Sequence, residues 1–161
     1  MKVAIITQED YFFIPKNIIK IADRFGSSAI TTILLIDSKG SINNKKSLFI
    51  RGFGLVQSMK YGLKVLQKKL IFFLTLIKLS KDNTHSIAGV ARHFNIPFSI
   101  VNDINEDKIF KRLEDLNLDI IISFSAPVVF RERLLNASKL GCINLHCSYL
   151  PYYAGLFPSF W

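Results

Sequence analysis

The sequence predicts an α/β fold in which helices cover both faces of a doubly wound, mostly parallel sheet. Short apolar runs of the buried-strand type recur along the chain, and segments with apolar residues at helical spacing separate them. Strands that alternate with helices favour parallel pairing in a sheet buried on both faces. With 161 residues, half of them hydrophobic, the chain is long enough for a core of its own. We therefore expect one domain over 1–161.

The first strand is expected at 2–7, where an apolar run ends in polar residues. Pro15 opens the following helix, because proline is favoured in a first helical turn, and Gly26 ends it. A second strand, rich in Ile, Thr and Leu, is predicted at 29–37.

The middle of the chain has a weaker pattern. A polar loop is predicted at 38–46, followed by one or two helices over 49–79. Within them, the apolar run from Leu70 to Ile77 is interpreted as a buried helix in preference to a membrane or partner face. It is far shorter than the roughly 20 residues that a bilayer span requires, so no membrane span is predicted.

In the second half of the chain, predicted helices and strands alternate again. Thr84 or Ser86 is suited to cap the first of its helices. The segment 127–135 is either a short helix or a loop followed by one. Helices are predicted at 83–94, 105–116 and 127–135, and strands at 98–101 and 119–123.

The stretch 141–155 is the strongest candidate for a functional site. Cys142 to His146 is predicted to be a short strand, and because side chains alternate along a strand, Asn144 and His146 share one face. Pro151 then breaks regular structure, which places the pair at the mouth of a loop, where open α/β sheets build ligand sites. Both side chains are suited to bind a developing oxyanion, although a structural histidine is an equal alternative.

Other site chemistries have less support. A metal site built from Cys142, His146 and Cys147 lacks a fourth ligand at zinc-site spacing, and Cys147 points away from His146, so no metal is predicted. Ser148 is not in a G-x-S-x-G elbow, and we expect its hydroxyl to brace the loop backbone. The first strand lacks a G-x-G-x-x-G fingerprint, which argues against a nicotinamide dehydrogenase.

The composition also bears on possible partners and on cellular location. The formal net charge of +9 is compatible with an anionic partner, whereas lysines spread through the chain equally favour a solvated surface. The N-terminus does not have the pattern of a signal peptide, and two cysteines suit reduced thiols, so a cytoplasmic location is expected.

The stretch Asn144-Leu-His-Cys-Ser-Tyr-Leu-Pro-Tyr-Tyr-Ala-Gly155 resembles the N-x-H-x-S-x-L-P-x-Y-x-G signature of folate-dependent formyltransferases. The likeness is greatest to the N-terminal catalytic domain of the methionyl-tRNA formyltransferase family and its relatives. Residues 119–130 are similar to the strand and folate-contacting loop of that family, and residues 10–15 to its first strand-to-helix turn.

The resemblance implies a Rossmann-like fold and transfer of a formyl group from 10-formyltetrahydrofolate to a primary amine, with methionyl-tRNA as the leading acceptor. Asn144 would hold the formyl oxygen, and His146 would stabilise the oxyanion and help proton movement to the folate nitrogen. A plain helix start is the alternative for the segment implied to line the pterin pocket. That pocket would be formed by Ser125, Ala126, Pro127, Val128, Val129 and Phe130, and the later loop would be braced by Ser148, Pro151 and Gly155.

The chain also departs from the family pattern. Cys147 and Tyr149 stand where Pro or Gly, and Leu, are common, and Ala154 stands where arginine is frequent, which affects acceptor recognition most. The family's catalytic aspartate has no counterpart before Trp161. We therefore expect a fold incomplete at the C-terminus, and weak or no transfer by this chain alone. An amino-sugar-nucleotide acceptor, and an inactive remnant or folate-binding module, are the alternatives.

Overall fold

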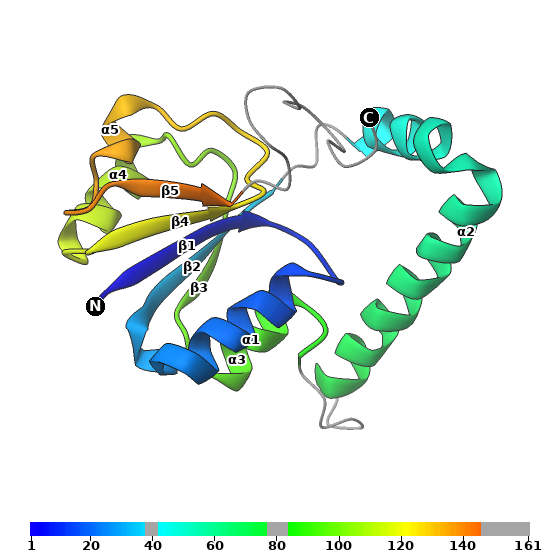
Figure 1. Ribbon diagram of the computed structural model, residues 1–161, viewed down its shortest axis with the longest axis horizontal. Coiled ribbons are helices and arrows are strands. Elements are labelled where there is room, and N and C mark those ends of the chain that lie inside the picture. The colour runs from blue at the N-terminus through cyan, green and yellow to red at the C-terminus, as the bar shows by residue number, and fades with distance from the viewer. Residues whose placement is uncertain (38–41, 77–83, 146–161) are drawn as a thin grey trace.

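A five-stranded parallel sheet organises the computed structural model, which describes residues 1–37, 42–76 and 84–145 (Figure 1). The strand order is β3-β2-β1-β4-β5, and each neighbouring pair is parallel. This arrangement confirms the predicted doubly wound sheet. The strands are β1 (Val3–Gln8), β2 (Ile30–Ile36), β3 (Phe98–Val101), β4 (Ile120–Phe124) and β5 (Cys142–Leu145).

Helices cover the two faces of this sheet, and a further long helix lies to one side (Figure 1). One apolar cluster joins the sheet to α1 and α3, and a second joins it to α4 and α5. Ile5 belongs to the first cluster and Ile6 to the second, as the alternation of strand side chains requires. The helices are α1 (Ile14–Phe25), α2 (Ile42–Leu76), α3 (Ile87–His93), α4 (Asp107–Asp115) and α5 (Glu132–Leu135), with a short 3₁₀ helix at Ser27–Ala29.

The structure decides between the alternatives that the sequence left open for the helix ends. Ser86 is the cap of α3, because its hydroxyl accepts a hydrogen bond from the backbone N–H of Gly89 at 3.0 Å. Helix α4 begins two residues after the predicted start at Asn105, which has a different role described below. The segment 127–135 is a loop followed by the short helix α5.

Two predictions for the middle of the chain are wrong. Residues 42–46, expected in a loop, are the first residues of α2, which bends at Gly54 where φ is 75°. The apolar run from Leu70 is not buried, because the exposed fractions of Leu70 and Phe73 are 58% and 55%. Its last residue, Ile77, lies outside the described residues. Within the described part of the chain, no helix is long and apolar enough to cross a bilayer.

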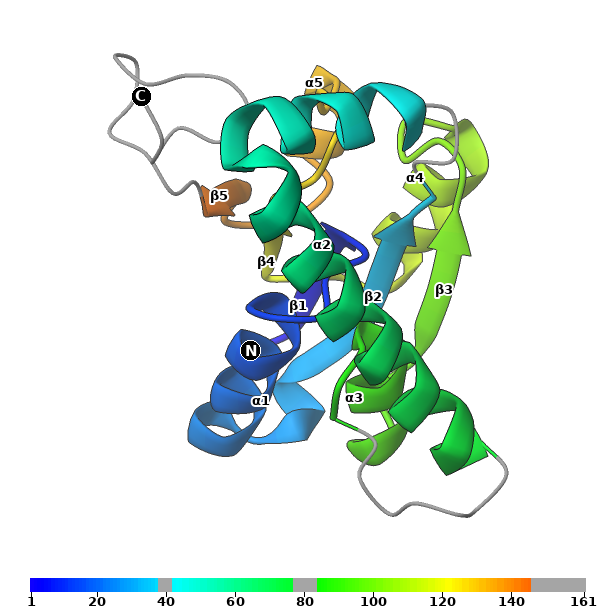
Figure 2. The same ribbon diagram turned by 90° about the vertical axis from the view of Figure 1, so that its right-hand side faces the viewer.

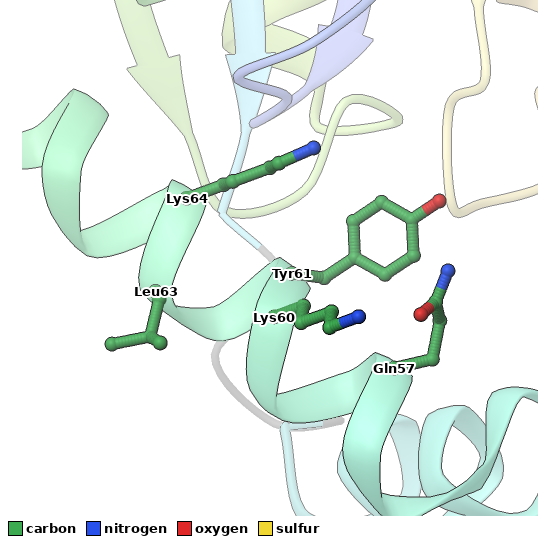
Figure 3. A pocket seen from close by; sticks show the side chains of 5 residues that line it. All are labelled: Gln57, Lys60, Tyr61, Leu63 and Lys64. Carbon is green, nitrogen blue, oxygen red and sulfur yellow. The ribbon is translucent and has the colours of Figure 1, made fainter.

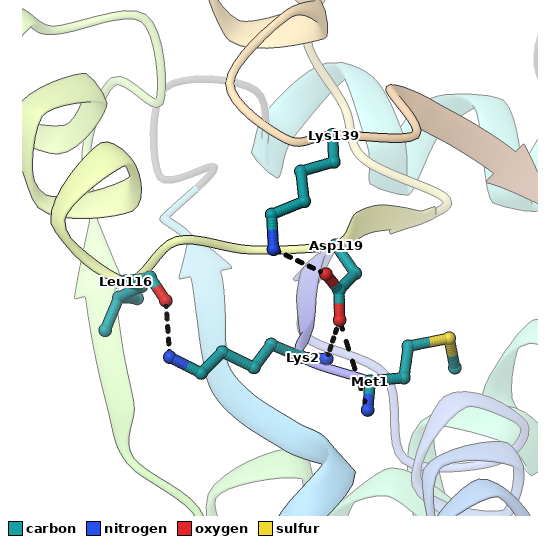
Figure 4. A network of polar contacts seen from close by, with 5 residues as sticks. All are labelled: Met1, Lys2, Leu116, Asp119 and Lys139. Carbon is teal, nitrogen blue, oxygen red and sulfur yellow. Dashed lines mark hydrogen bonds and ion pairs between the residues drawn. The ribbon is translucent and has the colours of Figure 1, made fainter.

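Polar contacts join the amino-terminal ends of β1 and β4, on the edge of the sheet opposite the candidate site (Figure 4). The Asp119 carboxylate accepts a hydrogen bond from the backbone N–H of Lys2 at 2.7 Å and another from the Lys139 ammonium at 3.0 Å. The hydrogen bond from Lys2, followed by that from Lys139, lowers the pKa of Asp119 below its ordinary value. The ionised carboxylate is therefore the form that supports the fold.

This lowered pKa predicts a pH-dependent effect of Asp119→Asn. A carboxyl group whose folded pKa lies below its unfolded value stabilises the fold above the unfolded pKa, and this contribution is lost as the pH falls through the folded pKa. We expect the variant to have a lower Tm than the natural protein at neutral pH, and the difference to close as the pH falls through the lowered pKa of Asp119. Thermal unfolding monitored by circular dichroism across this range is the measurement. A difference that stays constant with pH would contradict the assignment.

Candidate functional site at the carboxyl edge of the sheet

The strand order places a topological switch point between β1 and β4. From β1 the chain moves outward to β2 and β3, and it then returns to β4 and β5 on the other side of β1. In open α/β sheets, ligands bind beyond the carboxyl ends of the strands at such a point. The candidate site is therefore the edge formed by the turn after β1, the loop after β4, and the end of β5.

Buried polar groups fix the two central strands at this edge. Thr7, near the end of β1, has no exposed surface, and its hydroxyl donates a hydrogen bond of 2.9 Å to the carbonyl oxygen of Phe124 at the end of β4. The partner satisfies a hydroxyl that would otherwise be costly to bury. The loops that leave β1 and β4 therefore start from a fixed position.

Asp10 occupies the amino-terminal end of α1. One of its carboxylate oxygens accepts hydrogen bonds from the backbone N–H groups of Phe12, Phe13 and Ile14, at 2.9, 2.6 and 2.8 Å. A helix N-terminus attracts anions, and in dinucleotide-binding folds that position receives a phosphate. Here the chain fills the position with its own carboxylate, in agreement with the sequence argument against a nicotinamide cofactor.

The predicted pterin-lining segment, 125–130, is the loop that follows β4. It starts with Ser125 in the left-handed region, where φ is 51°. Val128 and Val129 are exposed, whereas Phe130 is partly buried against the core cluster shared with α4 and α5. Phe130 therefore anchors the loop while the two valines present apolar surface at the edge of the sheet.

Asn105 holds this loop through both ends of its side-chain amide. The Nδ2 group donates a hydrogen bond of 3.1 Å to the carbonyl oxygen of Val129, and the Oδ1 atom accepts one of 2.9 Å from the backbone N–H of Arg131. The sequence pattern indicated only that a helix starts at Asn105. An asparagine just before a helix is typical of a cap, so no local signal indicated its contact with a loop 24 residues away.

We expect Asn105→Ala to loosen the loop after β4. Loss of the two hydrogen bonds should lower the free energy of unfolding by only about 1 kcal/mol in total, since both bonds are exposed to solvent. It should also speed hydrogen exchange at the Arg131 amide, which donates to Asn105. Denaturant unfolding and exchange measured by mass spectrometry provide the two readouts. Asn102→Ala, at an exposed position three residues earlier, is the matched control, and equal effects in both variants would contradict the role of Asn105.

Asn144 lies on β5, beside the strand that leads into this loop. It is in register with Ser123 of β4, two residues before the loop begins, and its side chain is exposed. By alternation it shares a face with Cys142, which packs against the cluster of α4 and α5. The structure thus brings Asn144 and the loop 125–130 to one edge of the sheet. The other predicted site residues, His146, Ser148, Pro151 and Gly155, lie outside the described residues.

Two further ionisable groups lie in the turn after β1. Glu9 is exposed as a residue, but neighbouring atoms desolvate its carboxyl group and raise its pKa, against the effect of a hydrogen bond from the Ile87 backbone. Desolvation is the main cause that raises the pKa of the half-buried Tyr11 to about 12, and the negative charge of Glu9 is the second.

The Cys142 thiol, on β5, is also affected by burial, which raises its pKa, so this thiol is poorly suited to act as a nucleophile.

A hollow in the described part of the chain lies distant in sequence from these groups (Figure 3). It has a volume of about 240 Å³ and is formed within a single stretch of α2. None of the predicted site residues lines it, so it does not mark the candidate site. Among the described residues, no group of three or more His, Cys, Asp or Glu side chains is arranged to hold a metal ion. The residues around the hollow are Gln57, Lys60, Tyr61, Leu63 and Lys64.

The chain is similar in sequence to several methionyl-tRNA formyltransferases. The enzyme of Blochmanniella floridana is 33% identical over 120 residues, which are 70% of this chain and 37% of that protein. The enzyme of Kosmotoga olearia is 35% identical over 72 residues, which are 45% of this chain and 23% of that protein. This chain thus matches only between 23% and 37% of the length of these relatives. No protein-family model matches the chain.

A solved structure has the same fold. Glycinamide ribonucleotide transformylase 1 from Geobacillus kaustophilus superimposes with a TM-score of 0.53 at 13% identity, over 98% of this chain and 63% of that one. At this identity the similarity concerns the fold alone. Together with the sequence relatives, it confirms the resemblance to formyltransferases and the Rossmann-like α/β fold expected from the sequence.

Proposed function

We propose that this relative of the formyltransferases, as an N-terminal catalytic domain over 1–161, transfers a formyl group from 10-formyltetrahydrofolate to a primary amine. The proposal rests on the position of Asn144, which lies at the same carboxyl edge of β4 and β5 as the loop 125–130. The sequence similarity to methionyl-tRNA formyltransferases and the shared transformylase fold support the same reaction class.

The loop 125–130 has the properties that a flat, polar-edged ring requires. Val128 and Val129 offer exposed apolar surface at the edge of the sheet, which suits the faces of such a ring. Asn105 and the partly buried Phe130 restrict the backbone of the loop, which reduces the ordering that ligand binding would otherwise require. We therefore assign the pterin end of the donor to this loop.

The bound folate supplies the formyl group. The acceptor nitrogen forms a bond to the formyl carbon while the bond from that carbon to the folate nitrogen breaks. In the proposed reaction, Asn144 donates its amide N–H to the formyl oxygen as this oxygen gains negative charge. His146, two residues later in the sequence motif, stabilises the same oxygen. The acceptor amine loses one proton as its bond to the formyl carbon forms, and His146 helps the departing folate nitrogen to gain one, so that the protons balance.

Isothermal titration calorimetry with a stable 10-formylfolate analogue tests the donor site. We expect saturable binding, and we expect it to weaken in the double variant Val128→Asp and Val129→Asp, because both substitutions place charge on exposed apolar loop surface. Leu140→Asp, at another exposed apolar position, is the matched control. If the natural protein shows no saturable binding, the proposal is wrong.

Methionyl-tRNA is the acceptor that we propose first, since the sequence relatives act on it by name and the chain carries a net charge of +9. Phosphate contacts make affinity fall steeply with salt, so tRNA binding should weaken strongly as the salt concentration rises. An amino-sugar nucleotide is the second candidate, for which this salt dependence should be shallow. Donor binding without transfer to either acceptor would instead identify a folate-binding module.

A further inference from the structure

Helix α2 carries a continuous row of exposed apolar side chains, which we call the α2 stripe. Its members recur at alternating intervals of three and four residues, so they lie on one side of the helix. Each is more than half exposed, with exposed fractions between 55% and 69%. The stripe consists of Val56, Met59, Leu63, Leu66, Leu70 and Phe73.

The opposite side of α2 contacts the rest of the protein. The ring of Tyr61 packs edge-on against Phe12, with centroids 6.2 Å apart, and the Lys68 ammonium lies 5.7 Å from the centre of the Phe12 ring. Figure 3 shows Leu63 pointing away from Tyr61. In Figure 2, no described element covers the side of α2 that faces the viewer. The stripe therefore lies on the outer side of α2, whose inner side contacts Phe12.

The excess positive charge of the protein is concentrated around this helix. Residues 38–81 contain ten Lys or Arg and no Asp or Glu, whereas the rest of the chain contains eleven basic and twelve acidic residues. The basic residues are therefore distributed unevenly along the chain. With successive residues about 100° apart around the helix, Lys60 lies beside the stripe. The Lys69 ammonium lies 5.7 Å from the centre of the Tyr11 ring, so it belongs to the side of α2 that contacts the turn after β1.

The exposed apolar stripe and the excess of basic residues together indicate which partner binds to α2. A second copy of the chain would bring another α2, and two such helices would pair basic segments that contain no acidic partner. An anionic lipid surface satisfies both features, because apolar side chains enter the acyl boundary while flanking lysines bind headgroup phosphates. A large exposed apolar patch with a charged rim marks an interaction site of this kind.

We propose that α2 binds the surface of an anionic membrane, with the stripe inserted at the interface and Lys60 at the headgroups. The helix lies on the side to which the carboxyl ends of β4 and β5 point (Figure 1). Membrane binding would therefore bring the edge of the candidate site close to the bilayer. The inference rests on charge and exposure, and it holds whether or not the protein transfers formyl groups.

Co-sedimentation of the full chain with vesicles tests this proposal. We expect binding to vesicles of phosphatidylcholine and phosphatidylglycerol, and little binding to phosphatidylcholine alone. The double variant Leu63→Gln and Leu66→Gln should bind at least about tenfold more weakly, because it removes two inserted side chains. Lys60→Gln should bind about fivefold more weakly to the anionic vesicles, and high salt should weaken binding similarly.

Matched control variants test whether the loss of vesicle binding is specific to the α2 stripe and its flanking lysine. Leu140→Gln and Lys111→Gln change exposed residues of the same types on other elements, and we expect both to bind like the natural protein. Circular dichroism verifies that each variant is folded. Absence of binding to anionic vesicles, or equal losses in the controls, would overturn the proposal. A stable dimer that Leu63→Gln and Leu66→Gln dissociate, seen by light scattering, would overturn it in favour of a second copy.

Discussion

Replacing Asn144 by alanine is expected to lower formyl transfer by about 10²–10³-fold, since it removes a hydrogen-bond donor aimed at the developing oxyanion. The side chain is exposed on β5, so the fold should be unaffected. Turnover by the natural protein, which we expect to be weak, is measured with saturating donor and acceptor, and the preference for the formylated donor replaces it if no transfer is detected. The loss should be in kcat, because the hydrogen bond strengthens most in the transition state.

Donor affinity gives an independent measure of the same contact. Asn144→Ala should reduce the preference for 10-formyltetrahydrofolate over unformylated tetrahydrofolate, since only the former has the formyl oxygen. This second readout requires no turnover. Asn136→Ala, an exposed asparagine at the end of α5, is the control. If the variant keeps both its turnover and its preference for the formylated compound, Asn144 does not bind the formyl oxygen.

Replacing Ile6 by alanine is expected to cause the largest loss of stability, about 3 kcal/mol, through lost apolar burial and the cavity left behind. Ile6 is fully buried in the central strand β1, in register with Leu34 of β2 and Ser123 of β4. It precedes Thr7, whose hydrogen bond fixes the edge of the site. Urea unfolding should show a lower midpoint with an unchanged m value.

Ile100 provides the matched comparison for this prediction. It lies on β3, an edge strand of the described sheet, and its side chain is 61% exposed. Ile100→Ala should therefore cost less than about 1 kcal/mol, mostly from the lower β propensity of alanine. Equal losses at Ile6 and Ile100 would mean that the two apolar clusters do not provide the stability of the sheet.

The sequence by itself determined the strands, most helices and the fold class. Buried parallel strands are continuous apolar runs, so β1 and β2 could be located without knowledge of their neighbours. Local chemistry likewise located Pro15 at the start of α1 and Ser86 at the start of α3. The Asn144 motif was also a local signal, because its residues are consecutive in the chain.

Only the tertiary structure decided which segments meet and which side chains stay exposed. Asn105 contacts Val129, 24 residues away, and no pattern near either residue indicates that contact. The strand order joins Asn144 to the loop after β4, since register is a property of paired strands. The apolar run from Leu70 has the composition of a buried helix, yet α2 packs through its other side. Composition records how apolar a segment is, whereas burial depends on what packs against it.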